Sequence, residues 1–251
     1  MAFLLKNGAV FFHIPKTGGT WVKHVLEEMD LVQDSLGHPH SDWDRTLWHD
    51  KMHPDLKVAR YLLRRAVRSP RAKPRMDPRC FKFCFIREPL VWYESFWRYM
   101  HCEDRSGRVD SLGGDPYKWH PFTYLDGSGS PDFNTFMHNV NKNRPGFVTE
   151  MYGWYIRPGM DFVGKAESLR QDVITVLSLM KVDFDPQMIL SMPKQNETPS
   201  RLAKAEWDPK IKKETLRLEY AGYVRYGYPV EGIFGEMEPS KGSQAEMTRV
   251  G

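Results

Sequence analysis

The sequence predicts an α/β protein, with a single domain built on a mostly parallel central sheet flanked by helices. Residues 9–12 are a short apolar run followed by glycines and a helical pattern, and residues 81–86 are a second such run, followed by a proline and a helical pattern. Strands that alternate with helices are typical of units whose strands lie parallel in one sheet. We expect residues 1–237 to form the domain and the polar residues 238–251 to be a disordered tail.

The first strand ends in a turn suited to binding an anion. Pro15 stops the apolar run because proline cannot donate to a sheet ladder, and Gly18-Gly19 permits backbone angles that other residues resist. Apolar residues then recur at helical spacing, so a helix begins near Thr20, and its amide groups and dipole favour an anion. Lys16 adds a cation. The alternative is an ordinary strand–helix turn, and a Walker A loop is excluded because its lysine follows the glycines.

The second strand ends in Arg87-Glu88-Pro89, which indicates a second anion site. Pro89 is suited to the first position of a helix, and the apolar pattern predicts a helix over 90–102. Ser95 lies two turns into that helix, where it can share a ligand with Arg87. A guanidinium together with a hydroxyl favours a phosphate group. The alternative is a strand-end arginine beside a core helix.

Both motifs resemble those of the sulfotransferases that use 3′-phosphoadenosine 5′-phosphosulfate (PAPS), especially the carbohydrate sulfotransferases. The run His13-Ile14-Pro15-Lys16-Thr17-Gly18-Gly19-Thr20 resembles that family's P-loop-like strand–loop–helix for the 5′-phosphosulfate. The family's 3′-phosphate pattern, Arg-x-Pro-x-x-x-x-x-Ser-x-x-x-Tyr, is filled by Arg87, Pro89, Ser95 and Tyr99. The resemblance runs from about residue 9 to 229 and ends at Tyr226-Gly227-Tyr228, which is similar to the family's closing Phe-Gly-Tyr.

This resemblance implies the residues that bind PAPS. The 5′-phosphosulfate contacts are Pro15, Lys16, Thr17, Gly18, Gly19, Thr20 and Trp21, and the 3′-phosphate contacts are Arg87, Ser95 and Tyr99. A looser match implies further phosphate contacts in a loop that closes over the cofactor: Ser200, Arg201 and Lys204. Lys16 is also expected to be catalytic, because it lies beside the bond that breaks.

The polar loop after the first helix contains the candidate general bases. Carbohydrate sulfotransferases often have a Gly-His pair in this loop whose histidine acts as the base, and Gly37-His38 stands at the matching place. His40 is the second candidate. Pro39 separates the two histidines, stiffens the loop and points the two rings differently. A solvated loop histidine is the alternative. Other histidines and an aspartate follow, but their spacing matches no metal motif, so we expect no metal.

The rest of the chain predicts further helices and one more strand. Helical patterns cover 53–67, 133–141, 147–155 and 212–220, and residues 161–169 predict a strand and a turn that lead into a helix ending near residue 181. The basic run that begins in 53–67 and ends at Arg79 is either a solvated face or a landing surface for an anionic acceptor. Residues 103–131 are expected to be a loop whose aromatic side chains either stack on a sugar or anchor the loop.

Composition narrows the class of protein. The net charge is only +4, from 36 basic and 32 acidic residues, so we expect no nucleic-acid partner. Three cysteines cannot all pair and lack metal spacing, which predicts reduced thiols and a cytoplasmic location. The apolar start is too short, and too interrupted at Lys6-Asn7-Gly8, for a signal peptide or membrane span. We therefore expect a soluble, bare catalytic domain without an integral membrane segment.

The resemblance implies transfer of a sulfuryl group from PAPS to an acceptor hydroxyl, with PAP as product and a carbohydrate as the expected acceptor. One alternative is an ATP-dependent small-molecule kinase, although the order of lysine and glycines and the lack of an acidic Mg²⁺-binding strand count against it. The other is a non-catalytic nucleotide-binding module. Neither the acceptor nor the oligomeric state follows from the sequence, because acceptor pockets are built from variable loops.

Overall fold

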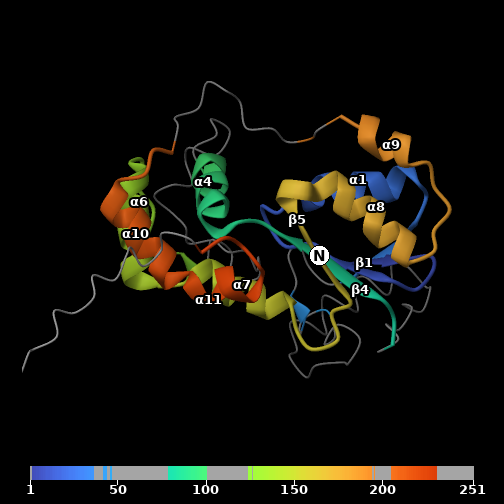
Figure 1. The fold of residues 1–251 in the computed structure, drawn as a ribbon, viewed down its shortest axis with the longest axis horizontal. Coiled ribbons are helices and arrows are strands. Elements are labelled where there is room, and N and C mark those ends of the chain that lie inside the picture. Colours follow the sequence, from blue (N-terminus) through green and yellow to red (C-terminus); the bar gives the residue numbers. More distant parts are fainter. Residues whose placement is uncertain are drawn as a thin grey trace, which may run out of the picture.

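The structure is a computed structural model that describes residues 2–36, 42, 43, 46, 79–100, 124, 125, 127–193, 195 and 205–230. Its centre is a five-stranded sheet in the order β3-β1-β2-β4-β5, with helices packed against it (Figure 1). The strands are Ala2–Leu5 (β1), Val10–Phe12 (β2), Val32–Leu36 (β3), Lys82–Ile86 (β4) and Phe162–Lys165 (β5). The described residues thus form an α/β structure, as the sequence predicts.

The helices begin where the sequence supplies caps. Proline opens α4, α9 and α10. It is tolerated there because the first N–H groups of a helix have no acceptor within the helix, so the missing N–H of proline costs no hydrogen bond. Aspartate caps α6, where the Asp132 carboxylate accepts from the Thr135 amide. The helical segments are α1 (Gly19–Glu28), α4 (Pro89–Met100), α6 (Phe133–Asn143), α7 (Phe147–Tyr155), η2 (Ala166–Ser168), α8 (Leu169–Leu179), α9 (Pro186–Ser191), α10 (Pro209–Leu218) and α11 (Tyr220–Arg225).

The sheet is mixed, so the expected mostly parallel sheet is not confirmed. β2 pairs parallel with β4 and β4 with β5, whereas β1 is antiparallel to both β2 and β3. A tight turn causes the reversal: the Leu5 amide donates to the Ala9 carbonyl, and Gly8 has φ +85°. Because only β1 is reversed, the other four strands end at one edge of the sheet, which we call the carboxyl edge.

Side chains alternate between the two faces of the sheet, and each face has its own core. Phe11 and Phe85 belong to the core that includes α1 and α8, whereas Phe12 and Ile86 belong to the core that includes α4 and α7. Figure 1 shows α1, α8 and α9 together over the sheet and the group α4, α6, α7, α10 and α11 to one side. The carboxyl edge faces the junction between these two groups of helices.

Several sequence predictions can be compared with these elements. The predicted helices at 133–141 and 147–155 are confirmed as α6 and α7, and the strand expected within 161–169 is confirmed as β5. The 53–67 helix, most of the 103–131 loop and the 238–251 tail lie outside the described residues. No helix within the described part of the chain is both long and apolar enough to cross a membrane.

Candidate anion-binding site at the carboxyl edge

The loop between β2 and α1 turns sharply at the carboxyl edge. Two of its residues adopt left-handed backbone angles, Lys16 at φ +65° and Gly18 at φ +83°. The buried Thr17 hydroxyl donates to the Ile14 carbonyl at 2.9 Å, so it closes the turn from inside. The sequence predicts that Thr17 contacts the anion, whereas in the structure the Thr17 hydroxyl donates its proton within the loop. Thr20, the other hydroxyl of the motif, is exposed.

The N-terminus of α1 lacks a side-chain cap. Gly18 is the N-cap residue, and no acidic residue lies in the first turn. The Trp21 and Val22 amides donate to the Gly18 carbonyl, and no side chain caps the start of the helix. The first amides of a helix have no partner inside the helix, and its dipole is positive there. This end of α1 is therefore suited to receive an anionic ligand.

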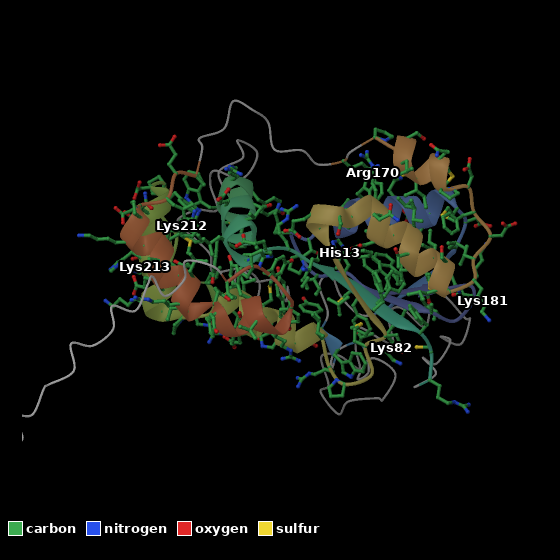
Figure 2. The ribbon with its side chains drawn as sticks, viewed as in Figure 1. His13, Lys82, Arg170, Lys181, Lys212 and Lys213 are labelled. Carbon is green, nitrogen blue, oxygen red and sulfur yellow. The ribbon has the colours of Figure 1, made fainter. Side chains whose placement is uncertain are left out.

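Close packing explains the two glycines of the loop. A Cβ on Gly19 would lie 2.0 Å from Cδ2 of His13, and a Cβ on Gly18 would lie 2.5 Å from Cδ2 of Leu169. The His13 ring is fixed because it stacks on Phe11 with 6.1 Å between the ring centroids. In the view of Figure 2, His13 lies between α4 and α8. The histidine thus packs beside the strand and shapes the loop.

Arg87 lies directly beyond the last residue of β4, at the same edge as this loop. β2 and β4 are neighbouring parallel strands, so the segments that follow them are neighbours too. The Arg87 side chain is half-buried, and its guanidinium makes no hydrogen bond or ion pair with another described residue. Ser95, also half-buried, lies in α4, the helix that follows Arg87.

Helix α4 joins the two motifs. The Lys16 ammonium lies 4.2 Å from the centroid of the Tyr99 ring, which is a cation–π distance. The Trp92 indole N–H donates to the Pro15 carbonyl at 2.8 Å, and both groups are buried. The structure therefore brings Lys16 and Tyr99 together, and it places Arg87 at the end of the adjacent strand.

Trp21, another expected contact, is part of the wall behind the loop. It is 5% exposed, and its indole N–H donates to the Pro193 carbonyl at 3.0 Å. The Arg170 guanidinium lies 5.8 Å from the Trp21 ring centroid and donates to the Met192 carbonyl at 2.7 Å. Figure 2 shows Arg170 on α8 above the sheet. Trp21 and Arg170 thus hold the chain at 192–193 against the two helices.

Two carboxylates beside Arg87 were not expected to matter at this site. The Glu167 carboxylate accepts from the Glu88 amide at 2.7 Å, and the Glu88 carboxylate accepts from the Val91 amide in the first turn of α4. Burial raises the pKa of Glu88 to about 7; the Val91 amide opposes this shift, and the neighbouring Glu167 and Glu94 add to it. Only one sequence signal indicates that Glu88 caps this helix: it directly precedes the proline that opens the helix.

The remaining predicted site residues lie outside the described residues: His38, His40, Ser200, Arg201 and Lys204. Leu36, which ends β3 two residues before His38, lies at the carboxyl edge, where Ala2 pairs with both Leu36 and Phe12. Among the residues that the structure describes, no group of three or more histidine, cysteine, aspartate or glutamate side chains could hold a metal ion.

Comparisons of the chain with protein-family models, with curated proteins and with solved structures found no match. The candidate site consists of the two segments that follow the adjacent parallel strands β2 and β4, with contacts from helix α4 to the first of them.

Proposed function

We propose that this protein is a PAPS-dependent sulfotransferase that transfers a sulfuryl group to an acceptor hydroxyl, with a carbohydrate as the expected acceptor. The observation that best supports this proposal is the position of Lys16 against Tyr99. This contact joins the uncapped N-terminus of α1 to the helix that follows Arg87. Two cationic sites at adjacent strand ends suit a ligand with two separate anionic groups, such as PAPS.

The residues at the carboxyl edge fit the two ends of PAPS. The amides of residues 17–20 and the Lys16 ammonium suit the 5′-phosphosulfate, because a helix N-terminus and a cation both favour negative charge. The Arg87 guanidinium, which has no ion-pair partner among the described residues, suits the 3′-phosphate, and Ser95 adds a hydroxyl. Tyr99 would then form part of the wall between these two sites.

In this proposal PAPS supplies the sulfuryl group, and three side chains assist its transfer. Lys16 stabilises the negative charge that grows on the leaving phosphate oxygen as its bond to sulfur breaks. His38, with His40 as the second candidate, accepts the proton of the acceptor hydroxyl as that oxygen bonds to sulfur. Arg87 holds the 3′-phosphate of the departing PAP.

Transfer of labelled sulfate tests this proposal directly. The protein is incubated with PAPS labelled in its sulfuryl group and with panels of glycans, small alcohols, phenols and lipids. We expect label to reach a glycan hydroxyl with the wild type and not with Lys16→Ala. Transfer to a phenol or an alcohol alone would support sulfotransfer and overturn the carbohydrate acceptor. The kinase alternative would be supported if labelled ATP with magnesium gave transfer and PAPS gave none.

A further inference from the structure

The buried hydroxyl of Tyr152 holds the backbone of Arg87 from both sides. Tyr152 lies in α7 and has no exposed surface. Its hydroxyl donates to the Arg87 carbonyl at 2.6 Å and accepts from the Arg87 amide at 3.0 Å. One side-chain oxygen thus satisfies both backbone hydrogen-bonding groups of this residue.

The sheet does not supply these hydrogen bonds, because Arg87 lies beyond the paired part of β4. The last pair of the ladder joins Ile86 to Lys165. Backbone groups near the core need partners, and Tyr152 provides them where the ladder stops. The Tyr226 ring packs edge-on against the Tyr152 ring, with 5.7 Å between centroids and 81° between planes. The hydroxyl is therefore held by a rigid, buried ring.

The next residue is held in a similar way from a different element. The Glu88 amide donates to the Glu167 carboxylate, and Glu167 also accepts from the Tyr228 hydroxyl at 3.3 Å. The turn from β4 into α4 is therefore fixed by side chains from two other segments. With its backbone fixed at this turn, the Arg87 side chain leaves the main chain in a defined direction.

We propose that Tyr152 is a positioning residue for Arg87 and thereby tunes recognition of the 3′-phosphate. This inference rests on the proposed function, in which Arg87 binds that phosphate. Tyr152 does not contact the ligand; it acts by fixing the backbone from which the guanidinium extends. Loss of its hydroxyl should weaken binding only for ligands that have a 3′-phosphate.

The test measures the affinities of PAP and of AMP, which lacks the 3′-phosphate, by isothermal titration calorimetry. Tyr152→Phe removes one oxygen and keeps the packed ring. We expect PAP affinity to fall about three- to tenfold, the size of one or two neutral hydrogen bonds, and AMP affinity to stay unchanged. Tyr93→Phe is the matched control, because Tyr93 is equally buried and its hydroxyl donates to Glu219 at 2.6 Å. Its preference for PAP over AMP should equal that of the wild type.

The outcomes separate this inference from the proposed function. If the wild type binds PAP no better than AMP, the proposed 3′-phosphate site is wrong, and the role of Tyr152 falls with it. If the wild type prefers PAP and Tyr152→Phe keeps the same preference, only the role of Tyr152 is overturned. Equal losses for PAP and AMP would show a purely structural role and would also overturn it.

A measurement on the wild type tests the same inference if Tyr152→Phe does not fold. Because the Arg87 amide donates to Tyr152 without any ligand, its hydrogen exchange should be slow in the free protein. Rapid exchange that slows only when PAP is added would show that the ligand, and not Tyr152, orders Arg87. That result would overturn the inference.

Discussion

The ammonium of Lys16 lies over the ring of Tyr99, 4.2 Å from its centroid. Lys16 belongs to the loop after β2, and Tyr99 belongs to the helix after β4. A second contact joins the same two segments, because the Trp92 indole N–H donates to the Pro15 carbonyl at 2.8 Å. The two candidate anion-binding motifs, far apart in sequence, are therefore in contact in the folded chain.

Replacement of Lys16 by alanine should affect turnover more than binding. In the proposed reaction the ammonium stabilises charge that appears only in the transition state. We expect Lys16→Ala to lower kcat about 10²–10³-fold and to weaken PAP binding less than about tenfold. The substitution adds no backbone strain, since Lys16 is already a residue with a Cβ at φ +65°. Steady-state kinetics with labelled PAPS measures the first effect and calorimetry the second.

Lys23→Ala is the control for that measurement. Lys23 lies in α1, the helix that follows the Lys16 loop, and its ammonium pairs with Glu27 at 2.9 Å one turn further along the helix. It should leave kcat unchanged, because an exposed ion pair contributes little and lies outside the site. Near-normal turnover in Lys16→Ala would contradict the catalytic role of Lys16.

Gly19→Ala should destabilise the protein and disturb the loop. The new Cβ would lie 2.0 Å from the His13 ring, and overpacking of this kind typically costs about 1–3 kcal/mol. The double variant Gly19→Ala with His13→Ala should recover part of that loss, because it removes the ring. Urea denaturation followed by circular dichroism measures both free energies of unfolding.

Gly153→Ala provides a matched control in a helix. Gly153 lies in α7, and a Cβ there would meet nothing within 4 Å. Alanine is a better helix former, so this variant should be as stable as the wild type or more stable by up to about 1 kcal/mol. If Gly19→Ala behaved like Gly153→Ala, the account of the glycine pair would be wrong.

Glu88 should make stability depend on pH. Burial raises its pKa to about 7, so between about pH 5 and 7 the folded state keeps a proton that the unfolded state has lost. The contribution of Glu88 to the free energy of unfolding therefore falls as pH rises through this window. Glu88→Gln does not ionise and keeps an acceptor for the Val91 amide. Relative to the wild type, the free energy of unfolding of Glu88→Gln should rise by about 1–2 kcal/mol between pH 5 and pH 8. This amount is smaller than the full pKa shift implies because Glu88 is partly exposed.

Denaturation of both proteins at pH 5, 6.5 and 8 measures this difference. A stability difference between Glu88→Gln and the wild type that stays constant over this range would show that Glu88 titrates at its ordinary pKa. A difference that shrinks toward pH 8 would give the opposite sign and contradict the burial argument.

The two strand–turn–helix units could be predicted from the sequence because each has strong local signals. An apolar run, a glycine or proline, and then a helical period mark β2 with α1 and β4 with α4. β3 has no such signal: four of its five side chains are only half-buried or exposed, so no clear alternation appears. It is specified by pairing with β1, which is a tertiary contact. The reversal at Gly8 was also missed, although Asn7-Gly8 is a typical turn sequence.

The same distinction applies to the site. Lys16 and Arg87 could be selected because each belongs to a local motif at the end of an apolar run. Tyr152 and Glu167 could not, because they reach Arg87 and Glu88 from elements far along the chain. Nothing in the sequence around Tyr152 distinguishes its hydroxyl from those of other tyrosines in a helical pattern.

The general base of the proposed reaction should be His38. We expect His38→Ala to lower kcat about 10²–10⁴-fold with unchanged PAP affinity, the range usual for a general base. The wild-type rate should also fall on the acidic side with an apparent pKa near that of histidine, about 6.5. If His40→Ala is the inactive variant instead, the base is His40. If both variants turn over normally and their rates still fall at acidic pH, no histidine of this loop is the base.

The most direct test of the central claim is calorimetric titration of the protein with PAP in the presence of EDTA. The account predicts that PAP binds without a divalent metal and that Arg87→Ala weakens this binding about ten- to a hundredfold, the size of a charged hydrogen bond. AMP affinity should be nearly the same in both proteins, because AMP lacks the 3′-phosphate. The claim would be contradicted if the wild type did not bind PAP in EDTA and bound ATP only when magnesium was added.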